Sequence, residues 1–257
     1  YQNADAAECP LVIDTSTSSC GNSRFGCWVC TVVEKDKSME NLIDSGEDWM
    51  QPLLELRQDL KDTQDPEKKL EIRDFKRRDG KVIFFTDGTE KITPGPYKIE
   101  FRKEFLKKLL QAQEQVRKDG PDSTMSLILE EEIHEIQRIW RVEQGDWENS
   151  VYAIYQEITG VNLSLVKEDM GGFTEVEQNI LDEICVQNSV PKLLVSKLLN
   201  AEFDSQGMTR HSKIYPKLGK ILSEEWRGYD EIETIKKELK EKKIKKIQNE
   251  QFSRETK

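Results

Sequence analysis

Four of the five cysteines in this sequence lie within its first thirty residues and could act together. Their spacing is C-x10-C-x6-C-x2-C, and the residues between them are rich in Ser, Thr, Gly and Asn. The last two are three residues apart, so one turn can aim both thiolates at a single centre, and the longer spacers can bring the other two round it. Such a group allows a metal centre, disulfides or a nucleophilic thiol. The four residues are Cys9, Cys20, Cys27 and Cys30.

Zinc and a 4Fe-4S cluster are the two metal centres to compare for this spacing. Structural zinc sites typically combine two C-x2-C pairs, whereas this sequence has one pair and two separate cysteines. A cubane cluster is larger than one ion, so the spacing favours iron. Arg24 could offset the charge of a cluster, while Phe25 and Trp28 could exclude water from it. The spacing alone leaves zinc, a disulfide and free thiols open.

The start of the chain indicates which compartment these thiols occupy. Residues 1–8, YQNADAAE, have neither the basic nor the apolar part of a secretory signal. No run approaches the roughly 18 to 20 apolar residues that cross a bilayer. We therefore expect a cytoplasmic protein without a membrane partner, where reducing conditions favour metal binding over structural disulfides. Because the chain begins at Tyr1 and reaches its cysteines at once, we expect the later part of a longer polypeptide.

The composition and the apolar spacing indicate that helices must position the cysteines. The chain is 36% hydrophobic and 34% charged with a net charge of -10, which is typical of helices with long solvated faces rather than of a large sheet. Apolar residues recur at helical intervals along most of the chain. The predicted helices span about residues 38–45, 47–62, 101–120, 125–140, 149–158, 174–187, 191–202 and 212–226.

One segment departs from the helical pattern. Two Asp-Gly turns flank the run VIFF at residues 82–85, which predicts a small antiparallel β-hairpin from about 81 to 93. We therefore predict a mainly α fold, a helical domain with this hairpin and an N-terminal Cys-rich cluster-binding loop. Three regions are expected: 1–62 with the cysteines and the following helices, 63–160 with the hairpin and helices, and 161–257 with further helices and a basic tail.

Two stretches of the sequence resemble a known family. Residues 8–43, ECPLVIDTSTSSCGNSRFGCWVCTVVEKDKSMENLI, and residues 95–113, GPYKIEFRKEFLKKLLQAQ, closely resemble the DndC family. Its members are sulfurtransferases of bacterial DNA backbone phosphorothioation and relatives of phosphoadenosine phosphosulfate reductases. The helical remainder is similar too, though less distinctively. The resemblance implies a 4Fe-4S cluster whose ligands match the family's cysteine pattern at Cys9, Cys20, Cys27 and Cys30.

The resemblance also implies an activity and partners. In that family an N-terminal domain with an SGGxDS-type PP-loop binds ATP and activates the DNA phosphate, and sulfur then replaces a non-bridging oxygen. This sequence contains no such motif, so we expect these residues alone to be inactive, and no catalytic residue is assigned. The implied partners are DNA and the other Dnd proteins, including a cysteine desulfurase. The alternative is a non-catalytic helical scaffold whose structural Fe-S or zinc site docks protein partners.

Other residues that could do chemistry have simpler explanations. Cys185 lies among apolar residues of a helix, so we expect a buried and inert thiol. His134 stands among glutamates, where we expect a solvated helix face rather than a metal site. Two clusters of Lys and Arg, together with Arg138 and Arg141, could contact phosphate, but solvated helix faces also explain them. The clusters are Arg73, Lys76, Arg77, Arg78, Lys81 and Lys98, Arg102, Lys103, Lys107, Lys108.

Overall fold

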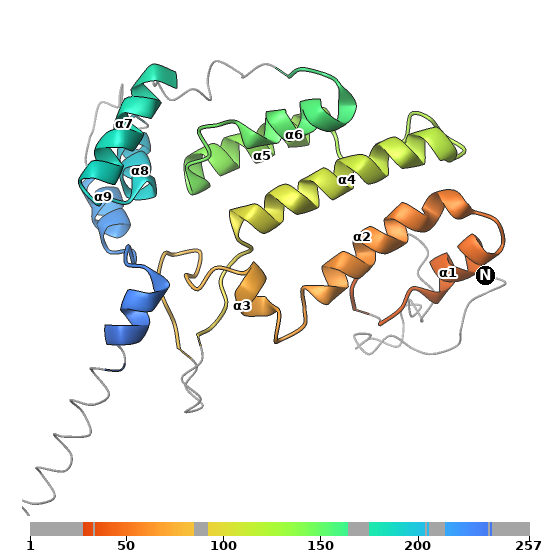
Figure 1. Ribbon diagram of the computed structural model, residues 1–257, viewed down its shortest axis with the longest axis horizontal. Coiled ribbons are helices and arrows are strands. Elements are labelled where there is room, and N and C mark those ends of the chain that lie inside the picture. The colour runs from red at the N-terminus through yellow and green to blue at the C-terminus, as the bar shows by residue number, and fades with distance from the viewer. Residues whose placement is uncertain are drawn as a thin grey trace, which may run out of the picture.

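The computed structural model describes residues 28–32, 34–84, 92–163, 175–203, 205, 214–235 and 237. Within these ranges the protein is mainly α, as the sequence predicts, and its nine α-helices are shown in Figure 1. No helix in these ranges combines the length and the apolar character needed to cross a membrane. The helices are α1 (Lys37–Asp44), α2 (Gln51–Asp62), α3 (Lys69–Ile72), α4 (Ile99–Asp119), α5 (Glu130–Ile139), α6 (Ser150–Thr159), α7 (Glu175–Gln187), α8 (Lys192–Phe203) and α9 (Ile214–Leu222).

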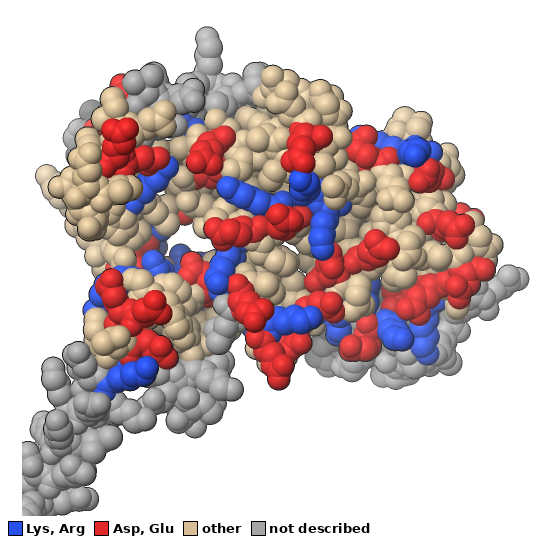
Figure 2. Space-filling model, viewed as in Figure 1, with Lys and Arg blue, Asp and Glu red and all other residues tan. Residues whose placement is uncertain are grey.

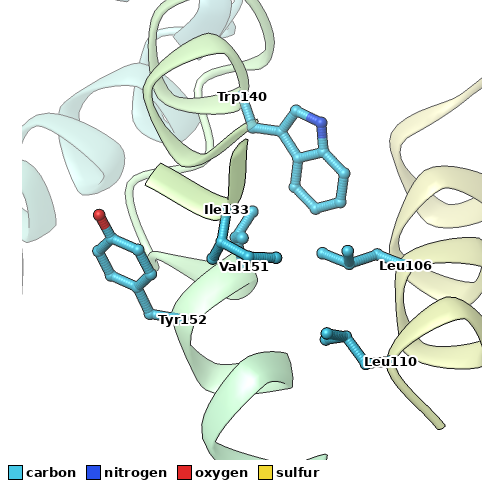
Figure 3. Packing of buried hydrophobic residues seen from close by; sticks show 6 residues of the cluster. All are labelled: Leu106, Leu110, Ile133, Trp140, Val151 and Tyr152. Atoms are coloured by element: carbon cyan, nitrogen blue, oxygen red, sulfur yellow. The ribbon is translucent and has the colours of Figure 1, made fainter. Parts of the chain in front are cut away.

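Helix α4 is the longest element and forms the centre of the fold. It has 21 residues, which corresponds to about 30 Å at the usual rise per residue. Helix α2 packs along it on one side, and α6 on the other. Leu106 and Leu110 on α4 therefore face Ile133 on α5 and Val151 on α6 in a dry core, which Trp140 and Tyr152 complete (Figure 3).

A second hydrophobic cluster holds helices α1 and α2 against the C-terminal end of α4. Met39 on α1, Leu53 on α2 and Val116 on α4 are all at most 5% exposed. Partly buried apolar side chains surround these three. Because three helices contribute to it, this cluster fixes α1 and α2 relative to α4. The surrounding side chains are Trp28, Ile43, Trp49, Met50, Leu54, Met125 and Leu127.

The C-terminal helices α7, α8 and α9 pack through α8, which also joins them to the rest of the protein. Helix α8 packs against α7, α9 and the π-helix Trp140–Gln144 that continues α5. The predicted break between α7 and α8 is confirmed, because Ser189 adopts a left-handed conformation with φ 55° that ends the helical path. Helix α8 then follows Pro191, whose ring suits the first turn of a helix.

Several helix boundaries differ from the predicted ones by a few residues. Helix α1 begins one residue earlier than predicted, and its cap is Asp36, whose Oδ1 accepts a hydrogen bond from Met39 N at 3.1 Å. A 3-10 turn at Asp48–Met50 precedes α2, so Pro52 lies in the first turn of that helix and causes no kink within it. Helix α5 begins five residues later than predicted, at Glu130.

Most of the predicted β-hairpin at 81–93 lies outside the described residues, which omit residues 85–91. Next to that gap, Phe84 and Ile92 form an isolated antiparallel bridge, and Arg73 and Tyr97 form a second one. The described residues of this region thus contain antiparallel bridges and no regular strand.

Candidate functional site

The structure describes one of the four predicted cluster ligands. Cys30 is half-buried and stands at the start of the segment 30–36 that leads into α1. Cys9, Cys20 and Cys27 lie outside the described residues, so the geometry available is that of the last ligand and its supports. Within the described part of the chain no group of three or more His, Cys, Asp or Glu side chains could hold a metal ion. A metal centre at this end of the protein therefore depends on the other three cysteines.

A buried arginine holds the backbone at Cys30. The side chain of Arg57 on α2 is fully buried at 0% exposure. Its Nε donates to the carbonyl oxygen of Cys30 at 3.3 Å, and its Nη1 donates to the carbonyl oxygen of Glu34 at 2.9 Å. One guanidinium thus fixes both ends of the five-residue segment 30–34. Hydrogen bonds from a charged group are stronger than neutral ones, so this contact is a strong local constraint.

Two further polar side chains hold the same segment from the end of α2. Lys61 Nζ donates to the carbonyl oxygen of Thr31 at 3.3 Å and lies 3.2 Å from a carboxylate oxygen of Glu34. Gln64 Nε2 donates to Thr31 Oγ1 at 2.5 Å. Arg57 and Lys61 lie one turn apart on α2, and Gln64 follows the end of that helix. Their polar contacts together hold Cys30, Thr31 and Glu34.

Apolar packing holds the other side of Cys30. Trp28, two residues earlier, packs against the cluster of Met39, Leu53 and Val116. The indole thereby anchors the end of the cysteine-rich segment on the body of the protein, while Arg57 anchors the residues that follow. Cys30 lies between an apolar anchor and a cationic anchor. A ligand residue needs such supports, because neighbouring contacts set the orientation and charge balance of a metal ligand.

The described residues at Cys30 fit a 4Fe-4S cluster in charge and polarity. A cluster held by thiolates is negatively charged, and the buried guanidinium of Arg57 places a positive charge beside the Cys30 peptide. Trp28, two residues before Cys30, packs on a hydrophobic cluster, and apolar surroundings limit the access of water to a metal site. The role of Arg57 was not predicted from the sequence, although this residue shares the apolar face of α2 with Leu53, Leu56 and Leu60. An arginine on an apolar stripe is the signal that could have identified it.

The structure agrees with the predicted position of Cys185 and differs from the predicted position of His134. Cys185 on α7 is 4% exposed, which confirms the predicted burial. His134 is half-buried rather than on a solvated face: its Nδ1 lies 2.7 Å from the hydroxyl of Tyr152, and the two rings meet edge to face. The expected solvated position is therefore wrong, because α6 packs over this face of α5.

The predicted phosphate-contacting residues are only partly available to a ligand. Arg141 is buried at 6% exposure and donates to Asn149 Oδ1 at 3.1 Å, so it cannot reach a polyanion. Arg138 makes two hydrogen bonds of 2.7 Å to Glu135. In the cluster from 98 to 108 three lysines pair with carboxylates, and Figure 2 shows this interleaving of charges over α2 and α4. The pairs are Lys103 with Asp146, Lys107 with Glu157 and Lys108 with Asp59.

Comparison of the chain with known protein families, with curated proteins and with solved structures finds no match.

Proposed function

We propose that this chain is the cluster-bearing part of a cytoplasmic sulfurtransferase that takes part in DNA backbone phosphorothioation. In this proposal Cys9, Cys20, Cys27 and Cys30 in the N-terminal Cys-rich loop hold a 4Fe-4S cluster. When bound, such a cluster can carry electrons or sulfur. Activation of the DNA phosphate with ATP belongs to a nucleotide-binding domain whose SGGxDS-type motif is not among these 257 residues. A cysteine desulfurase and the other Dnd proteins are the proposed protein partners.

The double anchoring of Cys30 is the observation that carries this proposal. The fully buried guanidinium of Arg57 fixes the carbonyl oxygen of Cys30, and contacts of this kind hold a metal ligand in its orientation. The C-x2-C spacing that ends at this residue supplies the metal-binding chemistry. The resemblance of residues 8–43 to the DndC family then selects iron and the modification of DNA.

In this proposal each described residue at the site has a physical task. Arg57 orients the chain at Cys30 through two carbonyl oxygens and contributes positive charge. Trp28 anchors the residues just before Cys30 on the hydrophobic cluster of Met39, Leu53 and Val116. Lys61 and Gln64 keep the following turn in place. None of these groups transfers a proton or attacks a substrate, so the described part of the site binds and positions.

A non-catalytic scaffold is the second candidate function, and α7 is the observation that favours it. Ile180 and Ile184, one helical turn apart, are 52% and 50% exposed, and Val186 is 80% exposed. Exposed apolar side chains on one helix are typical of a surface that meets another protein. In this reading the Cys-rich loop holds structural iron or zinc and the helices dock partners.

Metal and sulfide analysis of oxygen-protected protein tests the first candidate. We expect a brown protein with about four iron and four sulfide per chain. Cys30→Ser should lower the iron content strongly, whereas Cys185→Ala should retain it, because Cys185 is buried in a helix outside the Cys-rich loop. In cells that carry the complete modification system, Cys27→Ser or Cys30→Ser should abolish iodine-cleavable DNA.

Three results would contradict the proposal. A colourless protein with one zinc per chain would exclude the iron cluster and favour the scaffold. Iodine-cleavable DNA from the Cys30→Ser variant would show that the modification does not need this ligand. Hydrolysis of ATP by the 257 residues alone would also contradict it, because the proposal assigns nucleotide binding to another domain.

A further inference from the structure

A short basic loop, residues 73–81 with the sequence RDFKRRDGK, stands between α3 and the bridge at Phe84. Backbone hydrogen bonds hold it at both ends. Asp74 N donates to Pro96 O at 2.8 Å and Gly95 N donates to Asp74 O at 2.7 Å, while Glu225 N donates to Gly80 O at 2.8 Å. The loop is thus attached to two segments that are distant in sequence, and Figure 1 shows it between α3 and the chain that follows α9.

Close backbone packing makes this loop rigid. A Cβ atom on Gly95 would lie 1.7 Å from the carbonyl oxygen of Lys76, so only glycine allows this approach. Gly80 has φ +74°, the left-handed region that glycine adopts without strain, and its Cα packs against the side chain of Glu224. The cationic side chains of the loop therefore start from a fixed backbone, which lowers the entropy lost when they bind a ligand.

The lysines and arginines of this loop differ in their ion pairing from the lysines of α4. Among the residues that the structure describes, no carboxylate lies within ion-pair distance of Lys76, Arg77, Arg78 or Lys81, whereas Lys107 and Lys108 on α4 are both paired. Arg77, Arg78 and Lys81 are also exposed. The two acids of the loop are used locally: Asp74 Oδ1 accepts from Lys76 N at 3.0 Å and Asp79 Oδ1 accepts from Lys81 N at 3.1 Å.

We propose that the loop 73–81 forms a binding surface for the phosphate backbone of duplex DNA. The choice of DNA rests on the proposed function, whose substrate is a DNA phosphate. Guanidinium groups match phosphate oxygens in geometry, and this surface has two exposed ones, those of Arg77 and Arg78. With a net charge of -10 the chain as a whole repels DNA, so binding depends on a local patch of this kind.

The salt dependence of DNA binding by the 257-residue chain tests this surface. A labelled duplex of about 20 base pairs is titrated by fluorescence anisotropy from about 50 to 200 mM salt. Arg77→Gln/Arg78→Gln should weaken binding roughly tenfold and reduce the slope of log K against log salt by about 2, since two phosphate contacts are lost. The control Lys118→Gln/Lys220→Gln removes the same charge from exposed positions elsewhere and should leave the slope unchanged.

Each outcome decides for or against the surface. Equal slopes for the wild type and the arginine variant, or an equal loss in the lysine control, would overturn it. If polyglutamate displaces the duplex as well as unlabelled DNA does, the surface fits an acidic protein and the assignment to DNA is wrong. Arg78→Gln alone, which removes no hydrogen bond between described residues, repeats the test if the double variant unfolds. Iron content is measured on the same samples, so iron-free protein with a reduced slope would reject the cluster and keep the surface.

Discussion

The guanidinium of Arg57 bridges two backbone carbonyl oxygens, those of Cys30 at 3.3 Å and Glu34 at 2.9 Å. It reaches back 27 residues to the first of them, so α2 and the end of the cysteine-rich segment form one structural unit. Stability of the N-terminal region and formation of the cluster site should therefore depend on the same side chain.

Arg57→Ala should lower the free energy of unfolding by about 3 kcal/mol, because two charge-assisted hydrogen bonds are lost and a buried space is left. Chemical denaturation measures this change, and the iron content of the variant should fall in parallel. Lys61→Ala is the matched control: its partner Glu34 has an 85% exposed side chain, so the cost should be below about 1 kcal/mol. Wild-type stability and iron content in Arg57→Ala would refute the role of Arg57.

Gly95→Ala should destabilise the protein by about 3 kcal/mol or more, because the added methyl group would overlap the carbonyl oxygen of Lys76. Gly219→Ala is the comparison, since no atom lies within 4 Å of its added Cβ and the residue is within helix α9. That substitution should raise stability by up to about 1 kcal/mol through helix propensity. Thermal unfolding measures the change in stability of both variants. Changes of the same sign in the two variants would contradict the close packing at Gly95.

Gln113 on α4 is 2% exposed and satisfies two backbone donors, since its Oε1 accepts from Leu127 N at 2.8 Å and from Ile128 N at 3.1 Å. Gln113→Ala should lower the free energy of unfolding by about 2 to 4 kcal/mol, because both N–H groups lose their partner. Gln115→Ala, at an exposed position on the same helix, should change it by less than about 0.5 kcal/mol. Similar losses in the two variants would show that the contact is not important.

The carboxylate of Glu225 should titrate below the ordinary pKa of a glutamate. Hydrogen bonds from Arg227 are the main cause of the lowered pKa, and Lys76 contributes a smaller electrostatic effect. Because the folded pKa is lowered, the stabilisation is complete well above about pH 4.3, the unfolded value, and is lost as the pH falls through the folded pKa. An NMR pH titration measures this, and Arg227→Gln should move the midpoint up towards the ordinary value. An unchanged midpoint in Arg227→Gln would contradict this assignment.

Local sequence signals were sufficient for the helices and for some buried residues. The apolar spacing of residues 47–62 and 101–120 predicted α2 and α4 closely, because the 3.6-residue period is a property of the chain itself. The break between the helices at 174–187 and 191–202 and the burial of Cys185 were also predicted from neighbouring residues. The C-x2-C pattern likewise identified a candidate metal site from spacing alone, although the structure describes only Cys30 of its four ligands.

Only the tertiary structure decided what each charged side chain does. Arg57, Arg141 and Arg78 are the same residue type on or next to helices, yet one holds Cys30, one is buried against Asn149 and one is exposed without a carboxylate partner in the described residues. Partners far apart in sequence determine burial, ion pairing and strand pairing, and these partners come together only when the helices pack.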